Sequence, residues 1–188
     1  MESSPSGVER IDSFALVCYL PGELGAFLDR LRAELVTACS ARSHVTILPP
    51  RPLAGPESSA KQQIGNCIPE YQPFRVHLGE VDVFPQTKVI YLGLSLGSDH
   101  LRFLHDSLNV NALSFDEPFD YHPHVTLAQG VDPAQVDEAT RLAAARWSEF
   151  SHSRSFQVEA LTFVQNTSVN RWLDLVAYEL GSLAPVQK

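Results

Sequence analysis

The chain has 188 residues, of which 44% are hydrophobic and 19% charged, so it is typical of a globular protein with one sizeable core or two small lobes. Its formal net charge of −8 argues against a general binder of long nucleic acid, because such binders gather cationic surface. The longest apolar run, residues 14–20, is far too short to span a bilayer. Residues 1–12 lack an apolar signal-peptide core and are expected to be a flexible lead-in. Three widely spaced cysteines (Cys18, Cys39 and Cys67) favour free thiols and a cytoplasmic location.

The first half of the chain is predicted to alternate strands and helices. The apolar run at 14–20 is typical of a buried strand, and Pro21 and Gly22 end it. Apolar residues then recur at helical spacing, which predicts a helix with one apolar face over 24–35. The other elements expected in this half are a strand at 43–48 that ends at Pro49 and Pro50, a weaker helix at 57–67 and an alternating strand at 74–78.

The second half repeats this order. Residues 89–96 are rich in β-branched and aromatic side chains and predict a strand. Ser98 is a plausible cap for a helix with inward-facing leucines, and Asp132 with Pro133 indicates the start of a helix that runs to about Trp147. A strand is expected at 124–127, between the two helices. An alternating strand at 156–160 and a last strand at 172–180 follow the second helix, and these two pair with each other through a turn at 166–170.

The repeated order indicates an internal duplication. The tripeptide His-Val-Thr occurs at His44 and at His124, which are 124 − 44 = 80 residues apart, and Phe-x-Val segments begin at Phe74 and Phe156, which are 156 − 74 = 82 residues apart. We therefore predict an α+β fold with two lobes related by a pseudo-twofold axis, antiparallel-rich sheets that line a central cleft, and helices outside. The predicted domain spans residues 13–181, with lobes at roughly 13–87 and 88–181, and its last strand is allowed to pair across the lobes.

The two His-Val-Thr copies carry the chemistry of the sequence. In a strand, successive side chains point to opposite faces, so His44 and Thr46 share one face and the aliphatic residues between and after them share the other. His124 and Thr126 repeat this arrangement. If the two strands face each other across the pseudo-twofold axis, both histidines line one cleft. The sequence thus predicts a site with two imidazoles and two hydroxyls.

Two histidines on either side of a phosphorus atom suit phosphodiester chemistry. An imidazole with a pKa near 6.5 serves as base or acid close to neutral pH, and one neutral and one protonated histidine form an acid–base pair. Threonine hydroxyls donate hydrogen bonds to the non-bridging phosphate oxygens. The alternatives are that His44 and His124 are core histidines beside strand threonines, or that they form a zinc site with His122, although no carboxylate or cysteine stands at ligand spacing.

These motifs resemble those of the two-histidine phosphoesterase superfamily. Segment 122–127 (HPHVTL) resembles the second motif of its 2′-5′ RNA ligase-like branch, and segment 89–94 (VIYLGL) resembles the strand that opens the second lobe of that branch. The resemblance covers nearly the whole chain, from about Phe14 to Leu180. The chain departs from the family pattern at Gln129, where a basic residue is common, and at 49–51, where an aromatic-Leu-Gly run is common.

The resemblance implies a phosphodiesterase that needs no metal or cofactor. It would open 2′,3′-cyclic phosphates of nucleotides or short RNA 3′ ends to 2′-phosphates, with slow reverse formation of a 2′-5′ bond. By resemblance, His124 draws a proton from water and His44 protonates the leaving oxygen. The alternatives are a hydrolase of linear 2′-5′ oligonucleotides or of another small cyclic phosphate, and a non-catalytic nucleotide-binding module.

The expected partners follow from this reading. They are a small nucleotide or a short RNA end, with no long nucleic acid and no membrane, and the protein is expected to be a monomer. Three further residues are candidates for substrate binding. Arg51 would clamp a phosphate beside the first motif, and Tyr91 and Tyr121 would stack on a base. Core packing for the tyrosines and a solvated loop position for Arg51 are the alternative readings.

Overall fold

The computed structural model describes residues 8–36 and 42–182 and contains one mixed arrangement of helices and antiparallel strands. The predicted α+β class is therefore confirmed. The strands are β1 (Arg10–Tyr19), β2 (His44–Arg51), β3 (Phe74–Val83), β4 (Ile90–Leu96), β5 (Val125–Ala128), β6 (Ser155–Val158), β7 (Ala160–Thr167) and β8 (Leu173–Glu179). The α-helices are α1 (Gly22–Leu35), α2 (Glu57–Cys67), α3 (Ser98–Leu108) and α4 (Val136–Glu149), and the short 3₁₀ helices are η1 (Ile68–Glu70) and η2 (Asn111–Leu113).

All eight strands belong to a single sheet, whereas the sequence led us to expect more than one. Its order is β6-β3-β4-β5-β2-β1-β7-β8, and each neighbouring pair is antiparallel. The two motif strands β2 and β5 lie side by side in the middle. Strand β3, from the first half of the chain, pairs with β4, and β7, from the second half, pairs with β1. The two halves of the chain thus exchange a strand.

The C-terminal pairing differs from the prediction. The expected strand at 156–160 runs across a boundary between two strands, because β6 ends at Val158 and β7 begins at Ala160. Strand β6 pairs with β3 at one edge of the sheet, while β7 crosses to the other side and pairs with both β1 and β8. The last strand therefore pairs along β7, and the predicted partner segment 156–160 contributes only its end, where Ala160 lies opposite Glu179 and Glu159 accepts a hydrogen bond from Leu180. The alternation of the sequence indicated strands in this region, but it did not indicate that β6 and β7 pair with different strands.

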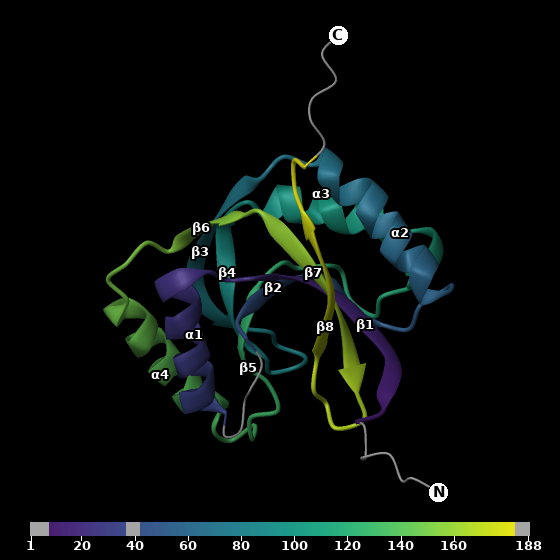
Figure 1. Cartoon of the computed structure of the whole chain (residues 1–188). Helices are drawn as coiled ribbons and strands as arrows, with labels where there is room; N and C mark the ends of the chain where they lie inside the picture. The colour runs from purple at the N-terminus through teal and green to yellow at the C-terminus, as the bar shows by residue number, and fades with distance from the viewer. Residues whose placement is uncertain (1–7, 37–41, 183–188) are drawn as a thin grey trace, which may run out of the picture.

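The helices pack against one face of the curved sheet in two pairs. Figure 1 shows α1 beside α4 in one pair and α2 beside α3 in the other, with the strands between them. The main core lies between sheet and helices and includes Leu28 of α1, Leu104 of α3 and Trp147 of α4, all at most 2% exposed. A small second cluster of Ala15, Val17 and Val164 lies apart from it. The face of the sheet that carries the motif histidines is thus not the face that the helices cover.

Several boundaries differ from those predicted. Strand β1 begins at Arg10, inside the expected lead-in, because Arg10 pairs with Thr167 of β7. Helix α4 begins at Val136, since Asp132 accepts hydrogen bonds in a turn that precedes the helix. Ser98 is the first residue of α3, and Gly97, with φ of 92°, is its cap.

The predicted free thiols can be followed for two of the three cysteines. Cys18 and Cys67 are free, and burial raises the pKa of Cys18 to about 12. Cys39 lies outside the described residues.

Candidate active site

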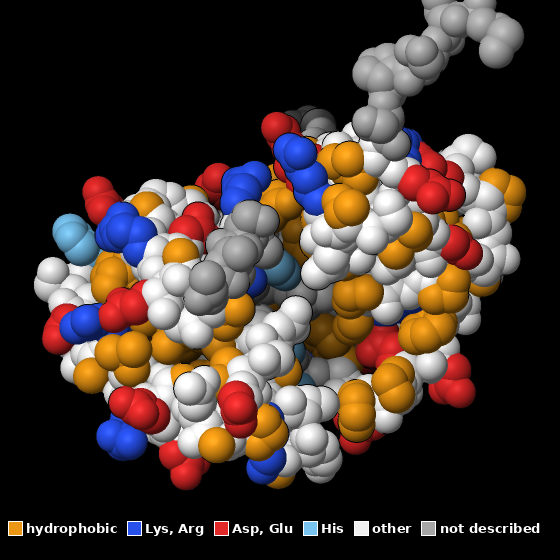
Figure 2. Space-filling model, turned by 90° about the horizontal axis from the view of Figure 1, so that it is seen from below, with side chains coloured by type: hydrophobic (Ala, Val, Ile, Leu, Met, Phe, Trp, Pro, Cys, Tyr) orange, Lys and Arg blue, Asp and Glu red, His pale blue; other side chains and the backbone are white. Residues whose placement is uncertain are grey.

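The structure brings the four predicted catalytic residues together. Strands β2 and β5 pair with Val45 opposite Val125, and both valines are fully buried. Their neighbours in each strand point to the opposite face, where they are half-buried. Because the strands are antiparallel, this register sets His44 beside Thr126 and Thr46 beside His124. Figure 2, which shows the molecule from below, has a hollow near its centre in which histidine side chains are visible.

The two histidines are held in the same way. Nδ1 of His44 lies 2.7 Å from the backbone oxygen of Arg42, and Nδ1 of His124 lies 2.6 Å from the backbone oxygen of His122. A carbonyl oxygen only accepts, so Nδ1 carries the hydrogen in both rings. Each neutral ring therefore presents the lone pair of Nε2. For His124 this nitrogen lies 3.2 Å from the hydroxyl oxygen of Thr126, so the second motif forms an internal His-Thr contact.

Burial lowers the pKa of both histidines. For His44, desolvation is the largest cause; the hydrogen bond to Arg42 and the carboxylate of Asp29 oppose it, whereas the charges of Arg32 and His124 add to it. For His124, desolvation again leads, opposed by the hydrogen bond to His122. Neutral imidazole is thus favoured in the free site at neutral pH. A bound phosphate anion would raise both pKa values by attracting a proton.

Helix α1 contacts both motifs through two side chains one turn apart. Asp29 accepts a hydrogen bond of 2.6 Å from the backbone N–H of Ser43, just before the first motif. Arg32, which is 7% exposed, donates one of 2.7 Å to the backbone oxygen of Thr126, inside the second motif. Strands β2 and β5 themselves share only one paired position, Val45 and Val125. We therefore infer that α1 contributes to the spacing between the two motifs.

Replacing Arg32 by methionine is expected to lower kcat/KM for a cyclic nucleotide by about tenfold or more and to destabilise the fold by about 1–3 kcal/mol, because a buried acceptor loses its partner. The pKa of His44 should rise, since a nearby positive charge is removed. Activity as a function of pH and thermal denaturation measure the two effects. Arg146→Met is the matched control: Arg146 pairs with Glu34 of α1 on the surface, where solvent screens the pair and its loss changes stability little. An unshifted pH profile in Arg32→Met would contradict the electrostatic part.

An aromatic cluster borders the second motif. The Phe84 ring stacks on Tyr91 with centroids 4.0 Å apart, and both rings meet His124 edge-on at 5.0 and 5.3 Å. The exposed His122 also meets both rings edge-on. Tyr91 is 7% exposed, and its hydroxyl donates to Asp82. The predicted base-stacking residue Tyr91 is therefore next to His124 but lies under Phe84, which is the more exposed ring and which the sequence did not single out.

Tyr121, the second predicted stacking residue, is used inside the protein. Its hydroxyl donates a 2.7 Å hydrogen bond to the backbone oxygen of Thr46, and its ring lies parallel to that of His105 at 4.1 Å. Because the hydroxyl is hydrogen-bonded and one ring face is covered by His105, this geometry does not support the stacking of a nucleobase on Tyr121. Tyr121 instead links the loop before the second motif to the strand of the first motif.

Arg51 lies in a buried network away from the motif face. Its side chain is 1% exposed, and its guanidinium donates to Glu117, to the side chain of Asn109 and to the backbone oxygens of Pro49 and Leu113. These contacts leave no exposed donor for a substrate phosphate. Our expectation that Arg51 clamps a phosphate therefore has no support in this geometry, and no local sequence pattern pointed to its partner Glu117.

Metal-ligand geometry is missing from the part of the chain that the structure describes. Within residues 8–36 and 42–182 no group of three or more His, Cys, Asp or Glu side chains is arranged to hold a metal ion. The zinc alternative would need His44, His122 and His124 together, and these three residues do not form such a group. In the same ranges, none of the helices has the length and apolar character to cross a membrane.

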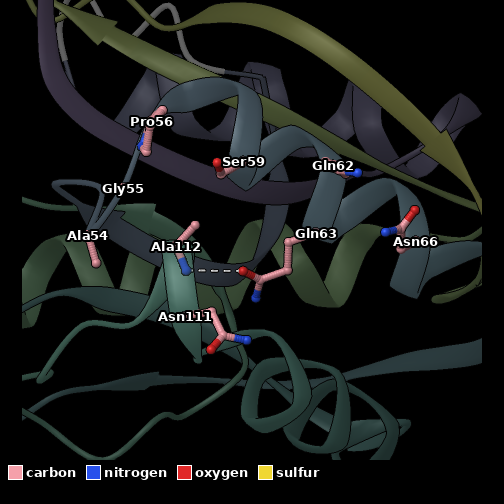
Figure 3. Close-up of a pocket in the computed structure, with 9 residues that line it drawn as sticks. All are labelled: Ala54, Gly55, Pro56, Ser59, Gln62, Gln63, Asn66, Asn111 and Ala112. Carbon is pink, nitrogen blue, oxygen red and sulfur yellow. Dashed lines mark hydrogen bonds between the residues drawn. The ribbon is translucent and has the colours of Figure 1, made fainter.

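A second hollow lies outside the two motifs. It is lined by small and carboxamide side chains of the segment before α2, of α2 itself and of η2 (Figure 3). The Gln63 carboxamide there donates to the backbone oxygens of Leu108 and Val110 and accepts from the N–H of Ala112. Its polar groups hold η2 against α2, so we assign this hollow a structural role.

Comparisons with known proteins agree with this geometry. A curated Bacillus cytotoxicus protein named as a phosphoesterase is 26% identical over 121 residues, which cover 60% of this chain and 69% of that protein. Escherichia coli LigT in complex with 3′-AMP shares the fold, with a TM-score of 0.64, 18% identity, and coverage of 93% of this chain and 99% of LigT. TT0787 of Thermus thermophilus matches with a TM-score of 0.60, 19% identity, and coverage of 90% and 98%.

The family model of the 2′-5′ RNA ligase superfamily matches residues 20–170, which include both His-Val-Thr motifs and most of the sheet. The match spans well over half of the chain and agrees with the resemblance read from the motifs. This chain belongs to the 2′-5′ RNA ligase superfamily.

Proposed function

We propose that this protein is a metal-independent phosphodiesterase that hydrolyses 2′,3′-cyclic phosphates of nucleotides or short RNA ends to 2′-phosphates. The observation that carries the proposal is the matched pair of histidines, each with Nδ1 fixed by a backbone oxygen and Nε2 left for chemistry. General acid–base catalysis requires two titrating groups whose proton-transfer atoms are held in place. A module that only binds nucleotides has no need of this arrangement.

In the proposed reaction, water attacks the phosphorus and forms the new P–O bond while the bond from phosphorus to the ribose 3′ oxygen breaks. Nε2 of His124 takes the proton from the water, and Nε2–H of His44 gives its proton to the leaving 3′ oxygen. The product keeps the phosphate on the 2′ oxygen. The hydroxyls of Thr46 and Thr126 donate to the non-bridging oxygens, where charge builds up in the transition state.

The relatives support the class of reaction and the size of the substrate. The Bacillus cytotoxicus relative is named as a phosphoesterase, and LigT has been solved with 3′-AMP, NADP⁺ and ATP. These ligands are small nucleotides, so we propose a small nucleotide or a short RNA end as substrate. The net charge of −8 also disfavours long polyanions. Of the acidic residues before the second motif, Asp116 and Asp120 are exposed, whereas Glu117 is paired with Arg51 and does not contribute to this repulsion.

The alternative functions differ in which substrates, if any, the protein hydrolyses. A hydrolase of linear 2′-5′ oligonucleotides or of another small cyclic phosphate would use the same histidines but prefer a different member of a substrate panel. A non-catalytic binding module would bind nucleotides and turn over none of them. Assaying nucleoside 2′,3′-cyclic phosphates, 2′-5′ dimers and ADP-ribose cyclic phosphate side by side distinguishes all three.

Hydrolysis of a cyclic nucleotide is expected to persist in excess EDTA, and its rate is expected to show a bell-shaped dependence on pH. One histidine must be neutral and the other protonated, and because the pKa values of both lie below 6.5 in the free protein, the optimum of kcat/KM should lie below pH 6.5. The optimum of kcat should lie at higher pH, since the bound phosphate raises both pKa values. Initial rates with a cyclic mononucleotide across pH, with and without EDTA, test this. Loss of activity on chelation that returns with metal would refute it.

A further inference from the structure

The guanidinium of Arg42 lies beside the first motif, on the ring of Tyr19. Its carbon lies 3.7 Å from the centroid of the Tyr19 ring, and its Nη1 lies 3.7 Å from Oδ2 of Asp174. The second distance is that of an ion pair without a hydrogen bond. The side chain is 61% exposed, and no residue in the described ranges accepts a hydrogen bond from the guanidinium. The Arg42 guanidinium is thus held in place by Tyr19 and Asp174, while its N–H groups remain able to donate hydrogen bonds to a ligand.

The other arginines around the site differ in this respect. Arg32 donates to the backbone oxygen of Thr126, Arg102 donates to that of Tyr121, and Arg51 is held by Glu117 and three further acceptors. These three use donors to hold the motif strands and the loop before β5. Arg42 therefore stands out as a cation with donors that remain available to a ligand.

Tyr19 and Asp174 hold this cation on the His44 side of the site. Tyr19 is opposite His44 in the β1–β2 register, and their rings meet edge to face at 6.3 Å. The Tyr19 hydroxyl donates a 2.6 Å hydrogen bond to Oδ1 of Asp174, and burial and this carboxylate raise the pKa of Tyr19, so the hydroxyl stays protonated. The guanidinium carbon lies 3.7 Å from the Tyr19 ring centroid, which is itself 6.3 Å from the His44 ring centroid, so both groups are close enough to contact the same small ligand.

We propose that Arg42, seated on Tyr19 and flanked by Asp174, binds a second phosphate group of the substrate, carried by the same nucleotide as the phosphate that lies between the histidines. This inference rests on the proposed function, because it takes the histidine pair as the first phosphate site. The planar fork of an arginine matches a phosphate in a bidentate way. The preferred substrates would then be nucleotides that carry a 5′-phosphate in addition to the cyclic phosphate.

The test is a comparison of two ligands that differ only in the second phosphate. Calorimetric titration at low salt should show adenosine 2′,5′-bisphosphate binding about tenfold more tightly than adenosine 2′-monophosphate, the effect of one partly exposed charge-assisted contact. The difference should shrink as salt is added. In Arg42→Gln the ratio of the two affinities should fall close to one, and in Arg42→Lys it should be intermediate, because lysine keeps the charge and loses the flat contact with Tyr19.

Two further variants test whether the preference for the bisphosphate depends on the position of Arg42 and not on charge alone. Arg141→Gln removes the same charge from an exposed position on α4 and should keep the wild-type ratio. Asp174→Asn should increase the preference for the bisphosphate, because a negative charge beside the guanidinium is removed while an acceptor for Tyr19 remains. A gain of this kind is not produced by partial unfolding.

The outcomes separate the subsite from the proposed function. Equal binding of the two ligands by the wild type, no binding of either, or a ratio that Arg42→Gln leaves unchanged would each overturn the subsite. A nucleobase stacked on the guanidinium would show as loss of both affinities together in Arg42→Gln, with the ratio intact. If the preference is observed but no cyclic phosphate is hydrolysed, the subsite stands and the phosphodiesterase proposal fails.

Discussion

Replacing either His44 or His124 by alanine is expected to lower kcat/KM for a nucleoside 2′,3′-cyclic phosphate by about 10²–10⁴, the usual contribution of a positioned acid or base. Each substitution removes the Nε2 that the motif histidine presents to the phosphate, while the backbone oxygen that held Nδ1 can bind water instead. Steady-state rates and thermal denaturation measure activity and folding separately. His152→Ala is the control, because His152 is exposed and its ring contacts Phe150 outside the motifs.

The two histidines should respond differently to the leaving group. A general acid is needed only while the leaving oxygen is a poor leaving group, whereas a base is needed whatever departs. His44→Ala, which lacks the proposed acid, should therefore recover much of its activity on an ester with a p-nitrophenolate leaving group. His124→Ala, which lacks the proposed base, should be impaired on both substrates.

The measurement is kcat/KM of both variants on both substrates, with binding confirmed for each. Rescue of His124→Ala in place of His44→Ala would reverse the two roles. Equal rescue of both would mean that neither histidine is a dedicated acid. Either result would leave the site intact and would reject the assignment by resemblance.

Removing the threonine hydroxyls is expected to have the next largest effect. Thr46→Val and Thr126→Val keep the shape of the side chain and delete a hydrogen-bond donor to the phosphate, which typically lowers kcat by about 10²–10³. For Thr126 the hydroxyl lies 3.2 Å from Nε2 of His124, so its loss also leaves that nitrogen without its neighbour. The effect should appear mainly in kcat, because the charge on the oxygens is greatest in the transition state.

Serine and a distant threonine supply the controls. Thr46→Ser and Thr126→Ser retain the hydroxyl and should recover most of the activity. Thr140→Val removes a hydroxyl that donates to the backbone oxygen of Val136 in α4, away from the motifs, and should leave kcat unchanged. If the valine variants of the motif threonines behave like Thr140→Val, the hydroxyls do not contact the reacting phosphate.

The sequence determined the four central residues because the pattern that marks them is local. A period of two along a strand fixes which side chains share a face, and the same tripeptide written twice at matching offsets shows that two strands carry the same feature. The buried pair Val45 and Val125 with the half-buried His44 and His124 is the outcome that this alternation predicts. The α+β class follows from the same kind of signal, since helical and strand periods are read within a few residues.

Tertiary structure alone decided what surrounds these residues. The partner of a strand is set by burial and register across the whole sheet, so the exchange of β3 and β7 between the halves of the chain left no mark in local periodicity. The same holds for Arg51, which is paired with Glu117 in the interior, and for Arg42, which lies on Tyr19 beside the site. A sequence shows that an arginine is charged, but only the packing of segments distant in the chain decides whether that charge meets a carboxylate or remains open to a ligand.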